Sequence, residues 1–540
     1  MKWTKHYQTS RTPQNQPIPG SNQKANNAGG YAWEVSDWTQ LDRFLILGSE
    51  GGTFYVGEQK LTIDNAEAVK RCIELDGIRT VNRIAEISES GRAPKNDPAL
   101  FALAMCASFG NEQTRKAALE ALPRVARIGT HLFHFMDFVQ GFRGWGRGLR
   151  RAIGDWYNQK DVKALALLAV KYRQRDGWTH RDALRLAHPK AQSDAHQKLY
   201  RWITQDEFAP AQGLEIVDAF RQAQTAPLKE VVHLIEKYRL PREAIPTEFL
   251  TRPEVWEAML PHMPLEAMVR NLANMTRIGL LTPMSESQRL VTQKLGNSEA
   301  ILKARLHPIK VLAALKTYAA GHGMRGQGTS WTPVQQVVDA LDAAFYTAFG
   351  SVTPTGKRMM LALDVSGSME AGQIAGVPGL TPRVASAAMA LVTAAVEAQH
   401  MITGFSAAGG GYGGQWGGGD PGMTPINISP RQRLDDVVRT VARIPMGGTD
   451  CSLPMRHALK EKIEVDAFVV YTDSETWYGK IHPAQALQQY RREMGIPAKL
   501  IVVGMVANRF SIADPKDAGM LDVVGFDTAT PEVMGDFILQ

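Results

Sequence analysis

The chain has few cysteines and no long apolar run. Its 3 cysteines, Cys72, Cys106 and Cys451, are scattered over 540 residues, whereas the cysteines of disulfide frameworks and zinc sites usually come in close pairs. The chain contains no stretch of about 18 apolar residues, the length that a membrane-spanning helix needs. The N-terminus also lacks the apolar core of a signal peptide. We therefore expect a cytoplasmic protein with no disulfide framework, no zinc site and no membrane partner.

The familiar signatures of enzymes are missing as well. The sequence contains no P-loop, no GxSxG nucleophile motif, no HExxH zinc motif and no zinc-deaminase pattern. We therefore predict that the protein is not an enzyme.

Positive charge is distributed unevenly along the chain. The formal net charge is +7, but residues 359–540 hold 14 Lys and Arg against 19 Asp and Glu, so the positive excess lies upstream. A basic first part favours a polyanionic partner and an acidic second part favours a cation, although net charge does not specify a fold.

Most of the first 350 residues follow the pattern of short helices. Residues 1–30 are the exception: they are polar and rich in Asn, Gln and Pro, which predicts a disordered or loosely docked tail. From Asn65 to about Gly350, helical segments are separated by breaks such as Leu240-Pro241 and Thr282-Pro283. This many short helices favour a solenoid of antiparallel helix pairs over a single bundle.

Local signals predict where two of these helices begin. Ser285-x-x-Gln288 has the form of a capping box, and Thr332 and Pro333 would cap and start the last helix. The apolar residues of this last helix recur at three-four spacing between Val334 and Phe349.

The pattern changes at Arg358. Four short apolar runs then alternate with helical segments: Met359–Val365, His400–Ser406, Ala467–Asp473 and Ala498–Met505. Such runs are typical of strands in a buried parallel sheet, so we predict an α/β doubly wound domain. A Gly-rich stretch from Ala408 to Gly422 would form a mobile surface loop without a chemical role.

Oxygen-bearing side chains follow two of the predicted strands. Asp364, Ser366 and Ser368 form the pattern DxSxS, while Asp473 closes the third strand and Thr449 follows a Gly pair. The carboxyl ends of parallel strands meet at one edge of a sheet, where these oxygens can converge on a hard cation. The order of the segments resembles the metal-ion-dependent adhesion site of von Willebrand A domains. A purely structural polar turn is the alternative.

The cation expected at this site is Mg²⁺, with Mn²⁺ or Ca²⁺ as alternatives. The resemblance implies that an acidic group of an unknown partner completes the coordination sphere. A metal-dependent nuclease that uses Asp364 and Asp473 is a further hypothesis.

Two basic segments lie in the helical part. Residues 141–157 combine arginines with Trp145, Trp156 and Tyr157, and residues 171–190 form a second block around Trp178. Arginine and aromatic side chains suit phosphates and bases, although a solvated helix face would have the same composition. If the second block begins as a helix, Lys171 and Arg175 share one face.

Several segments closely resemble the Ro (SS-A) ribonucleoprotein autoantigen family. They are Leu41–Thr62, Gly144–Gly148, Lys171–Lys190, Met268–Thr276, Arg305–Leu315 and Gly447–Met455. The resemblance indicates a bacterial-type member and implies a multidomain chain. A tail (1–30) would precede an all-α ring of HEAT-like helical repeats, the TROVE domain (31–357), and an α/β doubly wound von Willebrand A domain (358–540).

The resemblance also implies a function. Members bind small non-coding Y RNA on the basic outer face of the ring, and single-stranded 3′ ends of misfolded or precursor RNAs enter the ring hole. The expected role is RNA quality control or maturation, beside an exoribonuclease in bacterial relatives. A metal-dependent adhesion module whose repeats bind proteins is the competing hypothesis.

The family's RNA-binding residues carry over to Lys171, Arg175 and His188, although Pro189 follows the histidine directly. The full set of candidate RNA-binding residues is Arg147, Arg150, Arg151, Lys171, Arg175, Trp178, His180 and His188. Trp145, Trp178, His131 and His134 are candidate groups for stacking on bases. The Gly-rich segment Leu47–Tyr55 contains no visible catalytic base, and we interpret it as a structural turn.

Overall fold

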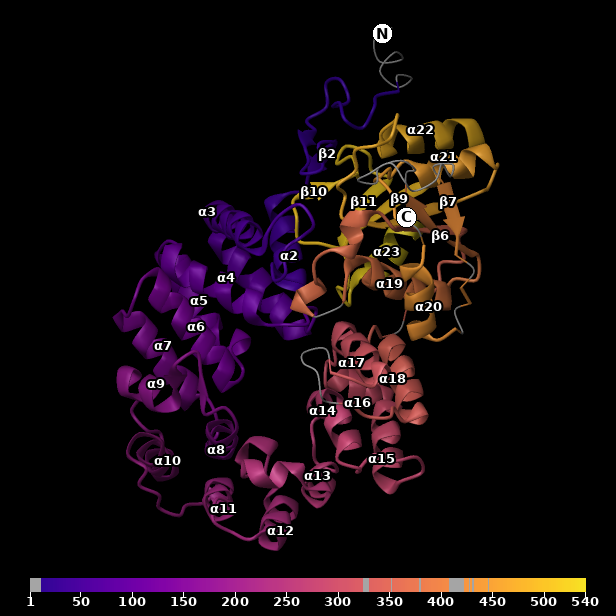
Figure 1. Cartoon of the computed structure of the whole chain (residues 1–540). Coiled ribbons are helices and arrows are strands. Elements are labelled where there is room, and N and C mark those ends of the chain that lie inside the picture. The colour runs from indigo at the N-terminus through magenta and orange to yellow at the C-terminus, as the bar shows by residue number, and fades with distance from the viewer. Residues whose placement is uncertain are drawn as a thin grey trace.

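The computed structural model describes residues 11–323, 330–350, 352–377, 380–406, 422–426, 428–429, 432–444 and 446–540. In Figure 1 the helices of the first part curve round in an arc, and both ends of the arc meet an α/β domain that completes a ring. This arrangement confirms the predicted fold class. The expectation of a mobile Gly-rich loop falls on residues outside those described, apart from Gly422.

The arc is built from helices that pack mainly on their neighbours in sequence. They are α2 (Asp37–Leu47), α3 (Glu58–Ser90), α4 (Asp97–Phe109), α5 (Glu112–Val125), α6 (Gly129–Phe142), α7 (Arg147–Asn158), α8 (Val162–Lys171), α9 (His180–Ala187), α10 (Asp194–Gln205), α11 (Glu215–Ala223), α12 (Leu228–Tyr238), α13 (Pro253–Met259), α14 (Leu265–Arg277), α15 (Glu286–Leu295), α16 (Ser298–Lys303), α17 (Pro308–Ala320) and α18 (Gln335–Thr347). Such neighbour-on-neighbour packing defines a solenoid.

The predicted helix starts are confirmed in one case and corrected in the other. The Ser285 hydroxyl accepts a hydrogen bond from the Gln288 N–H at the start of α15. The last helix, α18, begins at Gln335 after an N-cap residue Val334 that offers no side-chain oxygen, so Thr332 and Pro333 precede the helix instead of starting it. Its apolar face is buried as predicted.

The C-terminal domain contains a six-stranded sheet in the order β11-β9-β8-β5-β6-β7. Its strands are β5 (Met359–Asp364), β6 (His400–Ser406), β7 (Gly422–Pro425), β8 (Ala467–Thr472), β9 (Lys499–Gly504) and β11 (Met520–Val524). All pairs are parallel except the pair of β6 with β7. The four predicted strands are therefore present within one residue at each end, and the sequence analysis missed β7 and β11.

Helices cover both faces of this sheet: α19 (Pro382–Val396), α20 (Leu434–Ala442), α21 (Leu453–Lys460), α22 (Pro483–Met494) and α23 (Thr530–Leu539). Alternate residues of each strand point to opposite faces. Met360 and Ala362 pack in a core shared with α21 and α22, whereas Leu361 and Leu363 belong to a core that continues into the helical arc. The arc and the sheet domain are thus joined by a shared hydrophobic core.

The N-terminal segment is docked more firmly than its composition suggests. Gln14 is fully buried, and its amide donates to Asp450 Oδ1 at 2.7 Å and to the Ile481 carbonyl at 2.8 Å. Asn27 donates from its backbone and side-chain amides to the Glu475 carboxylate at 2.8 and 2.7 Å. For residues 11–30 the predicted loose tail is therefore corrected, because Asn and Gln side chains here satisfy polar groups of the α/β domain. Residues 1–10 lie outside the described part.

This segment also ties the arc to the sheet domain through short strands. β2 (Tyr31–Glu34) pairs antiparallel with β1 (Lys24–Ala25) on one side and with β10 (Phe510–Ser511) on the other. Among the residues that the structure describes, none of the helices combines the length and the apolar character that a bilayer crossing requires.

Candidate metal centre and basic surfaces

The first part of the metal centre lies in the turn that follows β5. Asp364 is fully buried, and its Oδ1 accepts a hydrogen bond of 2.9 Å from the Ser366 N–H. The hydroxyls of Ser366 and Ser368 are 3.2 Å apart. The short turn that begins at Gly367 thus gathers one carboxylate and two hydroxyls.

The neighbouring strand β8 supplies the second part. Thr472, the last residue of β8, donates from Oγ1 to Asp364 Oδ2 at 2.6 Å. The next residue, Asp473, interacts with the Ser368 hydroxyl and is 3% exposed. Thr472 was not among the sequence-based candidates, although its place before the strand-terminal aspartate was a usable signal.

Thr449 arrives from a loop on the same edge of the sheet. The Gly367 N–H donates to the Gly447 carbonyl at 3.4 Å, which joins this loop to the DxSxS turn. The Thr449 carbonyl accepts from the Trp477 N–H at 3.2 Å, and the residue is 1% exposed. The structure therefore brings all five predicted oxygen ligands to one buried edge.

The two aspartates lie in a buried place where their negative charges are unfavourable. Burial raises the pKa of Asp364, and burial together with the Asp364 carboxylate raises the pKa of Asp473 well above its ordinary value. Burial also raises the pKa of Glu475, next to Asp473. A buried pair of carboxylates is relieved either by protons or by a cation.

The donor set fits a hard divalent cation. Two carboxylates and three hydroxyls offer only oxygen atoms as ligands. Mg²⁺ prefers oxygen ligands, whereas zinc is bound mainly by the sulfur of Cys and the nitrogen of His. In the described part of the chain, no group of three or more His, Cys, Asp or Glu side chains could hold a metal ion, so the candidate site depends on its hydroxyl oxygens as well. Asp364, Ser366, Ser368, Thr449 and Asp473 are the residues that would hold the ion.

One residue of the helical arc also reaches this edge. Tyr55 precedes α3, yet its hydroxyl interacts with the Ser368 side chain, and burial and the nearby Asp473 raise its pKa. The sequence analysis interpreted Leu47–Tyr55 as a structural turn. The contact with the metal centre was missed because it exists only after the arc docks on the α/β domain.

The two basic segments meet on the surface of the arc. The rings of Trp145 and Trp178 lie 5.5 Å apart. The Asn158 amide donates to the Lys190 carbonyl at 3.1 Å, and Pro189 packs beside Gly154. Residues far apart in the sequence therefore form one continuous surface.

The second basic segment continues beyond α8 as a hairpin, so the condition under which Lys171 and Arg175 would share a helix face is not met. Helix α8 ends at Lys171, and β3 (Gln174–Arg175) pairs with β4 (Trp178–Thr179). Asp176 and Gly177 have φ angles of 51° and 79°, the geometry of a type I′ turn that Asp-Gly favours. Lys171 and Arg175 therefore do not share a helix face. Instead, Arg175 lies opposite Trp178 in the hairpin.

Most of the basic candidates are exposed, as RNA contacts require. Exposed side chains belong to Arg147, Arg150, Arg151, Arg175 and His188. Lys171 is half-buried, with Nζ 5.2 Å from the centre of the Tyr172 ring. His188 ends α9 with a left-handed φ of 47°, which settles the local geometry before Pro189.

Three histidine candidates are not free surface groups. His180 is 3% exposed and its Nδ1 lies 2.7 Å from the Tyr157 hydroxyl, so it belongs to the core instead of an RNA surface. Burial lowers the pKa of His131 to about 3, and its Nδ1 faces Asn96. His134 Nδ1 lies 2.5 Å from Asp176 Oδ2, which anchors the hairpin on α6. His131 and His134 thus use separate partners and do not form a metal pair.

A cationic cluster was missed where the two arms of the arc approach each other. His307 Nε2 lies 2.9 Å from the Arg92 carbonyl, which joins α17 to the end of α3. Arg127 and Arg305 lie beside this contact, and the partial burial of the Arg127 guanidinium, followed by the charge of Arg305, lowers the pKa of Arg127. No local pattern links these two arginines, because 178 residues separate them.

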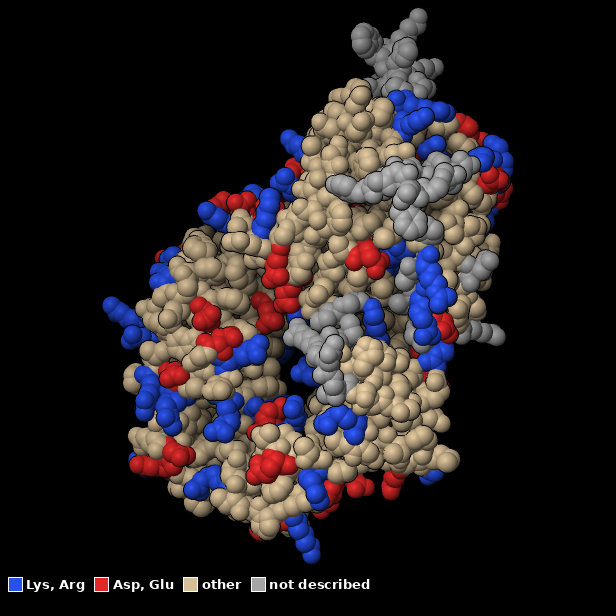
Figure 2. Space-filling view, viewed as in Figure 1, with Lys and Arg blue, Asp and Glu red and all other residues tan. Residues whose placement is uncertain are grey.

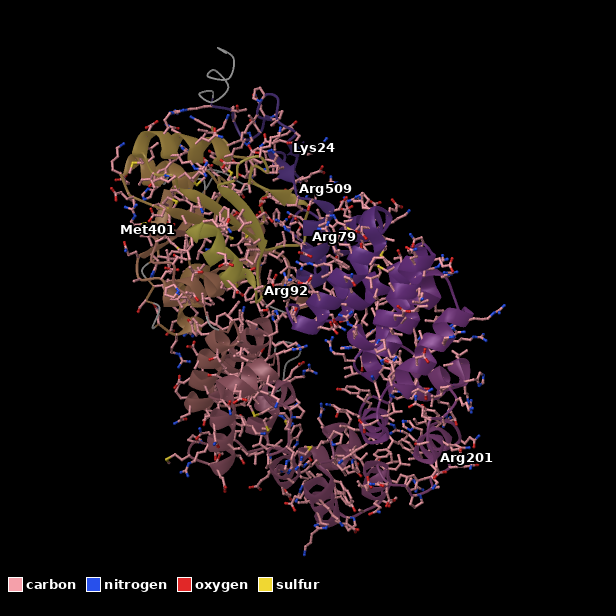
Figure 3. All side chains as sticks on the ribbon, turned by 180° about the vertical axis from the view of Figure 1, so that it is seen from behind. Lys24, Arg79, Arg92, Arg201, Met401 and Arg509 are labelled. Atoms are coloured by element: carbon pink, nitrogen blue, oxygen red, sulfur yellow. The ribbon has the colours of Figure 1, made fainter. Side chains whose placement is uncertain are left out.

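The space-filling view shows a hollow between the two arms, with blue Lys and Arg side chains at its rim (Figure 2). From behind, the opening is again visible, and Arg92 lies where the arc meets the α/β domain (Figure 3). The ring is therefore closed by the α/β domain and retains a central opening.

Comparisons with known proteins agree with this architecture. The TROVE domain model matches residues 24–231 and 236–317, and the Ro60 vWA domain model matches residues 358–538. An RNA-binding protein RO60 of Deinococcus radiodurans is 44% identical over 521 residues, covering 95% of each chain. One of Caenorhabditis elegans is 35% identical over 609 residues, covering 98% of this chain and 92% of the relative.

A solved structure is similar as well. The crystal structure of the Deinococcus radiodurans RO (RSR) protein matches with a TM-score of 0.69 and 42% identity, over 93% of this chain and 99% of that one. The chain therefore belongs to the Ro60 family, whose members combine a TROVE domain with a von Willebrand A domain.

Proposed function

We propose that this protein is an RNA-binding scaffold of RNA quality control or maturation. A structured, Y-like non-coding RNA would bind the outer surface of the ring. The observation that carries this proposal is the meeting of two basic segments around the Trp145–Trp178 pair. Exposed arginines there can neutralise phosphates, while the tryptophan rings offer faces for unpaired bases. The relatives, both named RNA-binding proteins, support the same role.

Single-stranded 3′ ends of misfolded or precursor RNAs would enter the central opening. Arg127 and Arg305 support this step, because like charges held close together are relieved by an incoming phosphate. A single strand is thinner than a duplex and therefore needs a narrower opening. In this role the protein would present RNA ends to a cytoplasmic exoribonuclease and would not itself cleave them.

The metal centre would hold a divalent cation, with Mg²⁺ preferred over Mn²⁺ or Ca²⁺. The five oxygen ligands support this proposal. At the exposed side of the cation an acidic group of a partner would complete the coordination. The converging ligands also favour a second candidate function, a metal-dependent adhesion module.

The experiment is a gel-shift titration of a structured RNA, once with and once without a single-stranded 3′ tail, at two salt concentrations. Lys171→Ala/Arg175→Ala should weaken binding about 10- to 100-fold and lower the salt dependence, because two phosphate contacts are lost. Arg127→Ala/Arg305→Ala should weaken binding only for the tailed RNA. The matched control, Lys460→Ala/Lys462→Ala, removes two exposed cations from the α/β domain and should bind as the wild type does.

Wild-type protein that binds neither RNA would overturn the scaffold proposal and favour the adhesion function. Labelled RNA incubated with pure protein and Mg²⁺ should remain intact. Cleavage that disappears in Asp364→Ala would instead identify a nuclease.

A further inference from the structure

The loop that carries Tyr55 is pressed against the metal-binding turn of the α/β domain. A Cβ atom on Gly372 would lie 2.9 Å from the Gly52 carbonyl oxygen, and one on Gly51 would lie 3.1 Å from Gln373 Cβ. Both glycines have φ angles in the left-handed region, 85° and 80°. Only residues without a Cβ permit so close an approach of two backbones. The contact therefore depends on glycines in both domains.

This loop is also ordered from within. The Thr53 N–H donates to the Val56 carbonyl at 2.8 Å, and the Val56 N–H donates to Thr53 Oγ1 at 3.0 Å. The Phe54 ring stands edge-on to the Tyr55 ring with centroids 4.9 Å apart. These contacts fix the direction of the Tyr55 side chain before any ligand binds.

Tyr55 adds an oxygen to the metal-binding edge from a different domain. Its half-buried phenol interacts with Ser368, one of the five oxygen ligands, and lies near the carboxylates of Asp364 and Asp473. Mg²⁺ favours six oxygens in near-octahedral geometry, so a phenol oxygen is a chemically suitable addition to the five candidate ligands.

We propose that Tyr55 is the ring's own ligand for the cation, and that its hydroxyl takes the position that a partner's acidic group would otherwise occupy. This inference rests on the cation site proposed above. A bound cation would then fasten the loop of residues 48–57 to the α/β domain. A carboxylate from outside could coordinate the cation only after this loop has lifted.

A neutral phenol is a weaker ligand for a divalent cation than a carboxylate. Its removal should therefore weaken cation binding without abolishing it, by about tenfold, which is typical for the loss of a supporting group at a metal site. Loss of Asp364 should remove binding altogether. The two variants thus separate the existence of the site from the contribution of the ring.

The experiment uses full-length protein and Mn²⁺ in place of Mg²⁺. Free Mn²⁺ is measured by electron paramagnetic resonance, and the water bound to Mn²⁺ by proton relaxation. Tyr55→Phe should bind about tenfold more weakly, with faster relaxation because one more water reaches the ion. Tyr478→Phe is the matched control: this tyrosine is 42% exposed beside Gly448, and its substitution should change neither readout.

Hydrogen exchange gives a second readout that requires no variant. Added Mg²⁺ should slow amide exchange in residues 48–57 of the wild type, and this protection should be absent in Tyr55→Phe and Asp364→Ala. The proposal is overturned if Mg²⁺ leaves the exchange of the wild-type loop unchanged, or if Tyr55→Phe matches the wild type in affinity and relaxation. Wild-type protein that binds no Mn²⁺ overturns the cation site and this inference together, while the gel-shift result still decides the RNA function.

Discussion

The two ends of the helical arc are attached to the α/β domain in different ways. At the N-terminal end, Arg43 is fully buried and donates to both oxygens of Asp522 at 2.7 and 2.8 Å, and also to the Asn508 carbonyl at 2.8 Å. At the C-terminal end, Asp339 of α18 pairs with Arg433 beside α20, and these side chains are 56% and 31% exposed. The ion pair of the first attachment is buried, whereas that of the second lies at the surface.

This difference indicates which ion pair contributes more to the stability of the ring. Removing one partner of a buried pair leaves an unsatisfied charge, whereas an exposed pair is screened by water and contributes little. The N-terminal junction also contains strand pairing of β2 with β10. We expect the N-terminal ion pair to contribute more to the free energy of unfolding than the C-terminal one.

The sharpest way to break the N-terminal junction is Arg43→Ala. This change leaves the Asp522 carboxylate, which is 13% exposed, without its guanidinium. The free energy of unfolding should fall by about 3–5 kcal/mol, as for other buried pairs that lose one member. Chemical denaturation followed by circular dichroism measures it. A loss below about 1 kcal/mol would contradict the proposed difference between the junctions.

Acid should weaken the contact between the two arms at His307. Burial lowers the pKa of this histidine to about 4, and its Nδ1 accepts from the Ile309 N–H. Because the unfolded chain binds the proton more readily, stability should fall as the pH drops from about 6.5 towards 4. The loss approaches about 3 kcal/mol at most.

The measurement is the unfolding free energy at pH 7 and pH 5. His307→Asn keeps an acceptor at this N-cap position but does not titrate, so its pH dependence should be shallower than that of the wild type. His180, whose pKa burial also lowers to about 4, remains in both proteins as a common background. Equal pH dependence in the two proteins would exclude His307 as the source.

Arg92→Ala tests a partly buried pair between the end of α3 and the α/β domain. Arg92 donates to Asp527, and the side chains are 16% and 6% exposed. An intermediate burial predicts an intermediate loss, about 1–3 kcal/mol in unfolding free energy. The unfolding temperature of this variant, measured by differential scanning calorimetry, should lie between those of Arg43→Ala and Arg433→Ala.

Arg433→Ala should have the smallest effect. The loss should stay below about 1 kcal/mol and should shrink further at high salt, because Asp339 is already solvated. A larger loss would show that the C-terminal junction is as firmly held as the N-terminal one.

Short-range patterns predicted the sheet domain well. The strand His400–Ser406 matches β6 residue for residue, and the oxygens from Asp364 to Asp473 converge because parallel strands share a carboxyl edge. Asp176-Gly177 was an equally short-range signal for the hairpin, and the sequence analysis did not use it.

Contacts that depend on docking could not be predicted in the same way. Tyr55 reaches the metal centre, and Arg127 approaches Arg305, only when distant segments are brought together. The prediction of a loose N-terminal tail was wrong for a different reason. The polar composition that predicted disorder proved complementary to the polar groups of another domain, as Asn27 and Glu475 illustrate.

The docked N-terminal segment has a consequence for biosynthesis. Asn27 and Glu475 are 448 positions apart, so Asn27 is translated long before the carboxylate to which it bonds. At about 5–20 residues per second, this segment waits for roughly 20–90 s before its acceptor is translated. During that interval the N-terminal segment has no α/β domain to bind. A partner that engages the growing chain would therefore meet an open arc of helices.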